Sequence, residues 1–169
     1  KGMKIRVPSR NAGLVVEAWG GSPVSMPAPE IYNAMQTGVL DGAMIDATAL
    51  TAFKLGEVTQ SVTTGMETSI SDFFLVMNRD SFNDLSEDQQ KVVQDAGKQA
   101  AINGSAAWNA VADKTLAEFG ATEGKQVITL TPEEAAKFDA ASKPVVEKVI
   151  AEADAAGLEA SAFVAALQE

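Results

Sequence analysis

The stretch KGMKIRVPSR opens the chain and carries one arginine, Arg6, between Ile5 and Val7. Alternation along a β-strand would place Ile5 and Val7 on one face and Arg6 on the other, and Pro8 would end the strand. A guanidinium is a planar fork of donors that binds a carboxylate through two parallel hydrogen bonds and stays charged at any relevant pH. The strand pattern alone leaves the role of Arg6 open. The ordinary interpretation is a solvated surface residue, because most arginines in proteins are exposed.

Two aspartates, Asp41 and Asp46, lie five residues apart and could form a carboxylate pair for acid–base chemistry. Asp41 precedes Gly42, however, and an aspartate–glycine pair is typical of a turn. The chain has no histidine and no cysteine. This composition excludes serine–histidine and cysteine–histidine catalysis and removes imidazole and thiolate metal ligands. We therefore expect no metal, no cofactor and no enzyme, with carboxylate-only catalysis as a minor alternative.

The aromatic pair Phe73 and Phe74 lies in DFFLVMN, the strongest strand signal of the chain. Adjacent residues of a strand point to opposite faces, so the two rings must lie on opposite faces of the sheet. The ordinary role of such a ring is packing in the core. A position in the wall of a ligand pocket is the alternative.

Composition and charge narrow the function classes. The chain has 169 residues, of which 46% are hydrophobic and 21% charged, as expected for a folded domain of ordinary size. Its net charge is −10, and residues 1–60 hold five basic and five acidic residues, so the acidic excess lies after residue 60. A chain of this charge is a poor candidate for binding nucleic acid. We recognise no membrane-spanning stretch and no signal peptide, and a first strand this close to residue 1 suggests a fragment.

Residues 1–60 read as strand, helix, strand, helix, strand, helix. This alternation favours crossover units and a mainly parallel sheet. In the last of these helices, ATALTAFKLGEVTQ, we expect Leu50, Phe53 and Leu55 to point inward. In order, the six predicted elements are 3–7, 12–19, 22–27, 29–37, 40–46 and 47–60.

The second part of the chain predicts one unusually long helix. Ser86 and Gln89 form a capping box, and the helical pattern continues to about Phe119. A helix of roughly 30 residues spans about 45–50 Å, which is wider than a small domain, so it should bridge two bodies. A strand, KQVITLT, and a helix capped by Thr131 follow. Pro144 should kink or divide that helix, and a short amphipathic helix should end the chain.

Four blocks of the sequence together resemble the solute-binding proteins of tripartite ATP-independent periplasmic (TRAP) transporters. They are GMKIRVP, GSPVSMPAPEIYNAMQTGVLDGAMID, KLGEV and FLVMNRDSFNDLSEDQQKVVQDA. The order and spacing of the blocks match from Gly2 into the long helix. No single block would carry the resemblance, and it covers only the second, C-terminal half of such a protein.

The resemblance implies an α/β, periplasmic binding protein-like fold with two lobes, a mixed sheet and a long bridging helix. The chain would supply the second lobe and part of the first. We expect residues 1–70 and 125–169 to form the second lobe. Residues 71–124 would hold a crossover strand, a helix of the first lobe and the bridging helix.

The resemblance also implies roles for individual residues. In this family the arginine of the KIRVP block typically pairs with the carboxylate of the ligand, and here that residue is Arg6. Ile45 stands where the family often has an asparagine, so one usual polar contact is replaced by an apolar one. Ser9 stands near a polar position that follows the strand of the arginine, and Glu67 falls in a loop that often supplies a pocket residue. We add Asp46, Phe73 and Phe74 as candidate pocket residues.

The function implied is that of an extracytoplasmic solute-binding protein. It would capture a small organic acid in the periplasm and deliver it to the membrane subunits of a TRAP transporter, as a monomer when full length. A binding module of an ATP-driven importer or of a sensor is the first alternative, and an enzyme is the second. Because Ile45 gives an apolar wall and Glu67 would repel a second carboxylate, we expect a ligand with one carboxylate and a compact, partly apolar body.

Overall fold

The computed structural model describes residues 1–66 and 73–167, and its first sheet has three parallel strands. The strands are β1 (Lys4–Val7), β2 (Ser22–Ser25) and β3 (Gly42–Ala43), in the spatial order β2-β1-β3. Lys4 pairs with Ser22 across one ladder, and Arg6 pairs with Ala43 across the other. The parallel pairing predicted from the alternation of strands and helices is confirmed.

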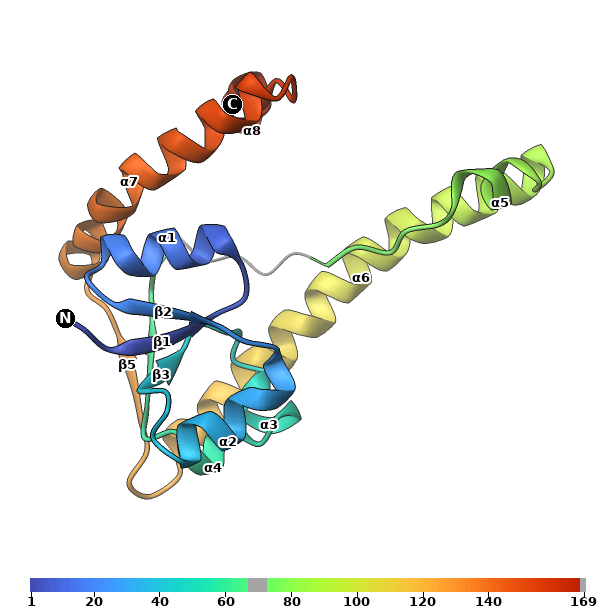
Figure 1. Ribbon diagram of the computed structural model, residues 1–169. Helices are drawn as coiled ribbons and strands as arrows, with labels where there is room; N and C mark the ends of the chain where they lie inside the picture. The colour runs from blue at the N-terminus through green and yellow to red at the C-terminus, as the bar shows by residue number, and fades with distance from the viewer. Residues whose placement is uncertain (67–72, 168–169) are drawn as a thin grey trace.

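Helices cover both faces of this sheet (Figure 1). Helix α1 (Arg10–Ala18) packs on the face of Val7, and its Gly13 lies against Val7 and Pro23. The other face carries Val24 and Ala43, which pack against a buried apolar cluster built around helix α2 (Ile31–Gln36) and the short 3₁₀ turn before it (Ala28–Glu30). The cluster consists of Ile31, Ala34, Leu40, Ala49 and Leu55. Arg6, one residue away from Val7, therefore points toward the α2 face.

The helix expected over residues 47–60 is two short helices, α3 (Ala49–Ala52) and α4 (Leu55–Val58). Lys54 separates them with a left-handed backbone, φ 55°, which a regular helix cannot contain. Leu50 and Leu55 face the apolar cluster as predicted. The prediction for Phe53 is wrong: the residue is 39% exposed and stands at the end of α3, directly before the break at Lys54.

A second sheet pairs β4 (Ser61–Thr64) with β5 (Gln126–Thr129), again in parallel. The strand β5 was predicted. The strand β4 was missed, because its sequence SVTT carries a single large apolar residue, Val62. Thr64 and Thr129 lie opposite each other, and their hydroxyl oxygens are 3.2 Å apart.

The long helix is present as α6 (Glu87–Gly120), with 34 residues and the predicted capping box between Ser86 and Gln89. It runs from the second sheet to a short helix, α5 (Arg79–Asn83), far from both sheets (Figure 1). Only Thr115 and Phe119, near its C-terminal end, are buried among its residues. Most of α6 therefore lies outside the body formed by the two sheets.

Phe73–Met77 is not a strand, contrary to the prediction. This segment is extended beside α6 and its side chains are exposed, with Leu75 at 96%. A strand needs a neighbouring strand to satisfy its main-chain groups. Among the residues that the structure describes, none pairs with this segment.

Two helices end the described chain, α7 (Pro132–Ala155) and α8 (Ala160–Leu167). The cap by Thr131 is confirmed, because Glu134 returns the bond of a capping box. Pro144 lies inside α7 without dividing it. Helix α7 packs against α1 through Trp19, whose ring meets that of Phe138 edge to face at 5.1 Å. Within residues 1–66 and 73–167 there is no helix with both the length and the apolar character needed to cross a membrane.

Candidate functional site

Arg6 is a buried cation at the carboxyl end of β1. Its side chain is folded under the ends of the two neighbouring strands, and the residue is only 6% exposed. Nε donates a hydrogen bond of 2.8 Å to the main-chain oxygen of Met26, which follows β2. Nη1 donates one of 3.2 Å to the main-chain oxygen of Met44, which follows β3. These two bonds fix the plane of the guanidinium across the end of the sheet.

The third nitrogen of Arg6, Nη2, makes no hydrogen bond within the described part of the chain. No buried side-chain nitrogen or oxygen of that part is left without a hydrogen-bond partner. Six ion pairs are recorded among the described residues, and Arg6 takes part in none of them. Within residues 1–66 and 73–167, Arg6 is thus a nearly buried positive charge with a donor left over and no acidic partner.

Burial lowers the pKa of the Arg6 guanidinium below its ordinary value, because desolvation disfavours the charged form. Arginine remains charged in proteins even so. A buried charge is normally paired, because its desolvation is costly. An anion at Nη2 would supply the missing pair.

The position of Arg6 in the sheet is the one where open α/β sheets bind ligands. The chain passes from β1 to β2 on one side and then returns past β1 to β3 on the other. Right-handed crossovers then put α1 and α2 on opposite faces of the sheet. In open α/β sheets ligands bind at such a reversal, outside the carboxyl ends of the strands, and Arg6 lies at that end of β1.

Ser9 caps helix α1 just beyond β1. Its hydroxyl oxygen accepts a hydrogen bond of 3.2 Å from the main-chain nitrogen of Ala12, and the residue is exposed. The hydroxyl proton is not used by that bond and can be donated to a ligand. Ser9 therefore combines a structural role with one available donor at the same end of β1 as Arg6.

Ile45 and Asp46 follow β3 directly, after the residue that holds Nη1 of Arg6. Ile45 is half-buried and packs against the apolar cluster, so it has the packing role of a core residue. Asp46 turns the chain into α3, because its Oδ1 accepts a hydrogen bond of 3.0 Å from the nitrogen of Thr48 and another from the hydroxyl of Thr48. The structure brings both residues to the same end of the sheet as Arg6. Asp46 is hydrogen bonded to Thr48, whereas a catalytic carboxylate pair would require Asp46 to act together with Asp41.

Two of the other candidates, Phe73 and Phe74, are not brought to this place. Glu67 lies outside the described residues. Phe73 packs its ring against that of Trp108 on α6, with centroids 4.6 Å apart, and Phe74 is exposed beside it. The aromatic pair therefore belongs to the segment along α6 and not to the strand ends.

Sequence reasoning missed the two residues that hold Arg6, Met26 and Met44. They act through their main-chain oxygens, so their side-chain types gave no signal. Their positions did give a signal, because Met26 and Met44 each follow a strand that is parallel to β1. The carboxyl ends of neighbouring parallel strands meet at one edge of a sheet.

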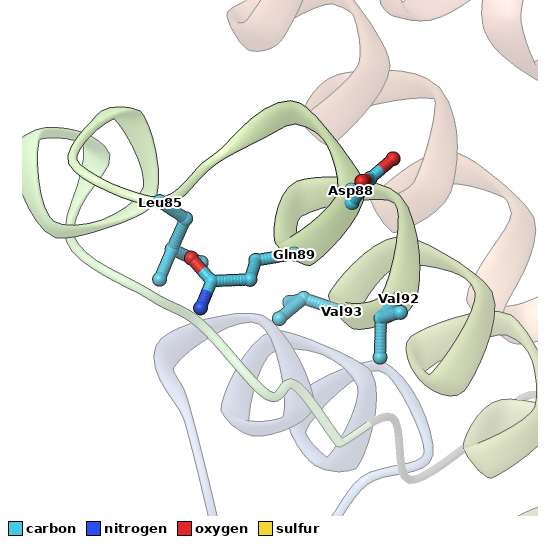
Figure 2. Close-up of a pocket in the computed structure, with 5 residues that line it drawn as sticks. All are labelled: Leu85, Asp88, Gln89, Val92 and Val93. Atoms are coloured by element: carbon cyan, nitrogen blue, oxygen red, sulfur yellow. The ribbon is translucent and has the colours of Figure 1, made fainter.

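A second concave surface lies at the start of α6. It is a shallow, mainly apolar groove of about 330 Å³ (Figure 2). Its residues are Leu85, Asp88, Gln89, Val92 and Val93. The side chain of Gln89 is engaged in the capping box, and Asp88 is the only charged residue of the groove. The groove offers no cation for an acidic ligand.

Comparison with known proteins points in the same direction as the Arg6 site. The family model described as bacterial extracellular solute-binding protein, family 7, matches residues 1–153. A solute-binding protein of Albidiferax ferrireducens is 39% identical over 101 residues, which are 59% of this chain and 30% of that protein.

Two solved structures are also similar. One is a TRAP solute-binding protein from an unidentified marine microbe, specific for aromatic acids and bound to metahydroxyphenylacetate. It has a TM-score of 0.81 and 26% identity, and the match covers 97% of this chain and 52% of that one. The other, from Bordetella bronchiseptica, holds both enantiomers of mandelate. It has a TM-score of 0.80 and 26% identity, with coverages of 98% and 53%. The chain thus spans about half the length of these structures.

Proposed function

Because the chain belongs to the bacterial extracellular solute-binding proteins of family 7, the periplasmic TRAP type, we propose that it forms the carboxylate-binding part of such a protein. In this proposal the complete protein captures a small organic acid in the periplasm and passes it to the membrane subunits of a TRAP transporter. It acts as a monomer and performs no chemistry on the acid.

The buried guanidinium of Arg6 is the observation that carries the proposal. It lies at the carboxyl ends of the strands, lacks an acidic partner in the described residues, and keeps donors on Nη2 and one on Nη1. Nε already donates to Met26, so the pair of donors that includes Nε is not available to the ligand. The carboxylate therefore binds end-on, accepting hydrogen bonds from Nη1 and Nη2.

The division into lobes supports an enclosed ligand. In the proposal residues 1–70 and 125–169 form one lobe, and residues 71–124 lead into and return from the other. Helix α6 is exposed along most of its length and reaches far beyond the sheets, as a helix shared by two lobes would. A ligand between two lobes loses most of its contact with water, which strengthens its hydrogen bonds to Arg6.

We propose a monocarboxylate with an apolar or aromatic body as the ligand class. The residues that follow β2 and β3 at the end of the sheet where Arg6 lies, Met26 and Met44, have no polar side chain to offer a ligand. Each hydroxyl of a sugar acid left unpaired there would cost about 1–3 kcal/mol. The two similar structures described above hold aromatic monocarboxylates.

A thermal-shift screen of the complete protein against organic acids, followed by calorimetry, tests the proposal. A ligand that binds only the folded state raises the melting temperature by mass action. We expect phenylacetate-like and mandelate-like acids to give shifts that the corresponding amides and alcohols do not. Recovery of the acid unchanged after incubation separates binding from catalysis. A protein that binds no carboxylate, or that converts it, would contradict the proposal.

A further inference from the structure

Asp41 lies where the chain enters β3, and it binds both main-chain groups of Lys4 on the neighbouring strand. Its main-chain nitrogen donates a hydrogen bond of 2.9 Å to the oxygen of Lys4. Its side-chain Oδ2 accepts a hydrogen bond of 2.8 Å from the nitrogen of Lys4. The two residues are 37 positions apart in the chain, so the contact joins the start of β1 to the start of β3. The carboxylate of Asp41 is therefore part of the sheet, and a turn is not its only role.

The carboxylate replaces an acceptor of the main chain. Hydrogen bonds between parallel strands are slanted, so a residue bonds with the residues on either side of its partner. The register of β1 on β3, continued by one residue, places Asp41 opposite Lys4 and would direct the nitrogen of Lys4 to the oxygen of Leu40. That nitrogen bonds to Oδ2 of Asp41 instead. Leu40 is held by α2, because its own nitrogen donates to the oxygen of Ala34 at 3.1 Å.

Met44, at the other end of β3, makes a similar double contact with Arg6. Its nitrogen donates a hydrogen bond of 2.8 Å to the main-chain oxygen of Arg6, and its oxygen accepts the bond of 3.2 Å from Nη1. The strand between Asp41 and Met44 has only two residues, so it has few ladder bonds of its own. A slip of one residue would take the oxygen of Met44 away from Nη1. The bonds that Asp41 makes therefore bear directly on the position of Met44.

We propose that Asp41 is a positioning residue for the binding of the acid. Its carboxylate fixes the start of β3 against Lys4, so that Met44 presents its main-chain oxygen to Nη1 of Arg6. Asp41 does not touch the ligand, and its effect passes through the two residues of β3. The inference rests on the proposed function, in which Arg6 binds the carboxylate. A guanidinium that is fixed in advance loses less entropy when the acid binds.

The bond that Asp41 makes to Lys4 needs an oxygen and not a charge. Asparagine has a side-chain oxygen at the same position and carries no charge, so Asp41→Asn separates the bond from the charge. Asp41→Ala removes the acceptor and leaves the main-chain nitrogen in place. Asp41 is exposed, so the alanine variant removes no core volume and should fold.

The first measurement needs no ligand. Rotation about the bond between Nε and Cζ exchanges Nη1 and Nη2 of Arg6, and the hydrogen bonds to Met26 and Met44 slow this rotation. Nuclear magnetic resonance of the ¹⁵N-labelled complete protein measures the rate, with the Arg6 signals assigned by their loss in Arg6→Lys. We expect Asp41→Ala to accelerate the rotation about five- to tenfold, the effect of losing one hydrogen bond. Asp41→Asn should keep the rate within about twofold of the original.

The second measurement is calorimetry of the complete protein with phenylacetate as the probe. We expect Asp41→Ala to raise Kd about five- to tenfold and Asp41→Asn to change it less than about twofold. The control is Trp19→Phe, which removes the bonds of the indole nitrogen to α7 and lies outside the proposed site. It should lower the melting temperature and leave both the rotation and Kd unchanged.

Three results would overturn the role of Asp41. Unchanged rotation and Kd in Asp41→Ala would mean that Leu40 and the ladder alone fix β3. An asparagine variant that behaves like the alanine variant would show that the charge acts and not the bond. Equal effects of Trp19→Phe would reduce the result to a general loss of stability. If the unmodified protein does not bind phenylacetate, the proposed ligand class is wrong, and the rotation of Arg6 alone decides the role of Asp41.

Discussion

Nε of Arg6 donates a hydrogen bond of 2.8 Å to the main-chain oxygen of Met26, so the second strand of the sheet holds the arginine of the first. Together with the bond from Nη1 to Met44, it turns a flexible side chain into a fixed one. A donor whose orientation is set before the ligand arrives loses less entropy on binding. The remaining N–H groups of Arg6 are in this sense prepared for an acid.

Replacing Arg6 should weaken ligand binding by the complete protein. Arg6→Ala removes one or two charge-assisted bonds and leaves the charge of the ligand unpaired, a loss of about 3–5 kcal/mol. This corresponds to a hundredfold to several-thousandfold rise in Kd, measured by calorimetry with the acid found in the screen. Arg6→Lys should recover only part of the loss, because a point charge replaces a fork.

The control for this prediction is Arg10→Ala, which removes an exposed arginine of α1 that pairs with Glu152. It should change Kd less than threefold. Arg6→Ala also takes donors from the oxygens of Met26 and Met44, so we expect it to lower the free energy of unfolding by about 1–3 kcal/mol as well. An Arg6→Ala protein that binds the acid normally would show that the anchor is elsewhere.

The sequence singled out Arg6 as a candidate anchor but not the groups that hold its side chain in place. Arg6, the strands around it and both capping boxes could be read from residue types at fixed spacings, because each depends on neighbours within a few positions. The bonds to Met26 and Met44 depend on which strands become neighbours of β1. The order of strands is decided by the whole sheet, and the side chains of Met26 and Met44 do not indicate it, because only their main-chain oxygens bind Arg6.

The failures have the same origin. Phe73–Met77 has the composition of a buried strand, yet pairing requires a partner at long range, and the described residues supply none. Strand β4, with its sequence SVTT, gives almost no apolar signal and is a strand because β5 lies beside it. The break at Lys54 was missed for another reason: lysine is not a residue type that predicts a left-handed backbone.

Lys54→Gly should stabilise the fold. The residue has φ 55°, a conformation that costs a residue with a side chain roughly 1–2 kcal/mol. Glycine removes this strain but adds freedom to the unfolded chain, so the net gain should be about 0.5–1 kcal/mol in a urea titration. Lys98→Gly, at an exposed position inside α6, should instead cost up to about 1 kcal/mol. Equal destabilisation by both changes would contradict the prediction.

Trp19→Phe should weaken the contact between α1 and α7. The indole nitrogen donates to the hydroxyl of Ser142 at 2.8 Å and to the main-chain oxygen of Phe138 at 3.2 Å. Phenylalanine keeps an apolar ring there but makes neither bond, so we expect a loss of about 1–2 kcal/mol in unfolding followed by circular dichroism. Trp108→Phe, on the exposed part of α6, should cost less than about 0.5 kcal/mol. Similar losses from both would mean that the bonds of Trp19 add nothing.

Acid should loosen the junction between α7 and α8 before it affects the sheets. Asp154 accepts hydrogen bonds from the hydroxyl and the main-chain nitrogen of Ser161, and these bonds lower the pKa of Asp154 below its ordinary value of 3.8. A depressed carboxyl pKa adds stability above the pKa of the unfolded chain, and that stability is lost as the pH falls through the folded value. Hydrogen exchange of α8 should therefore accelerate, relative to that of β1, as the pH is taken from neutral to below about 4, after correction for intrinsic exchange rates. Asp154→Asn should remove most of this change while leaving the exchange of β1 unaltered. If the Asn variant kept the full acid response, another carboxyl group would be responsible.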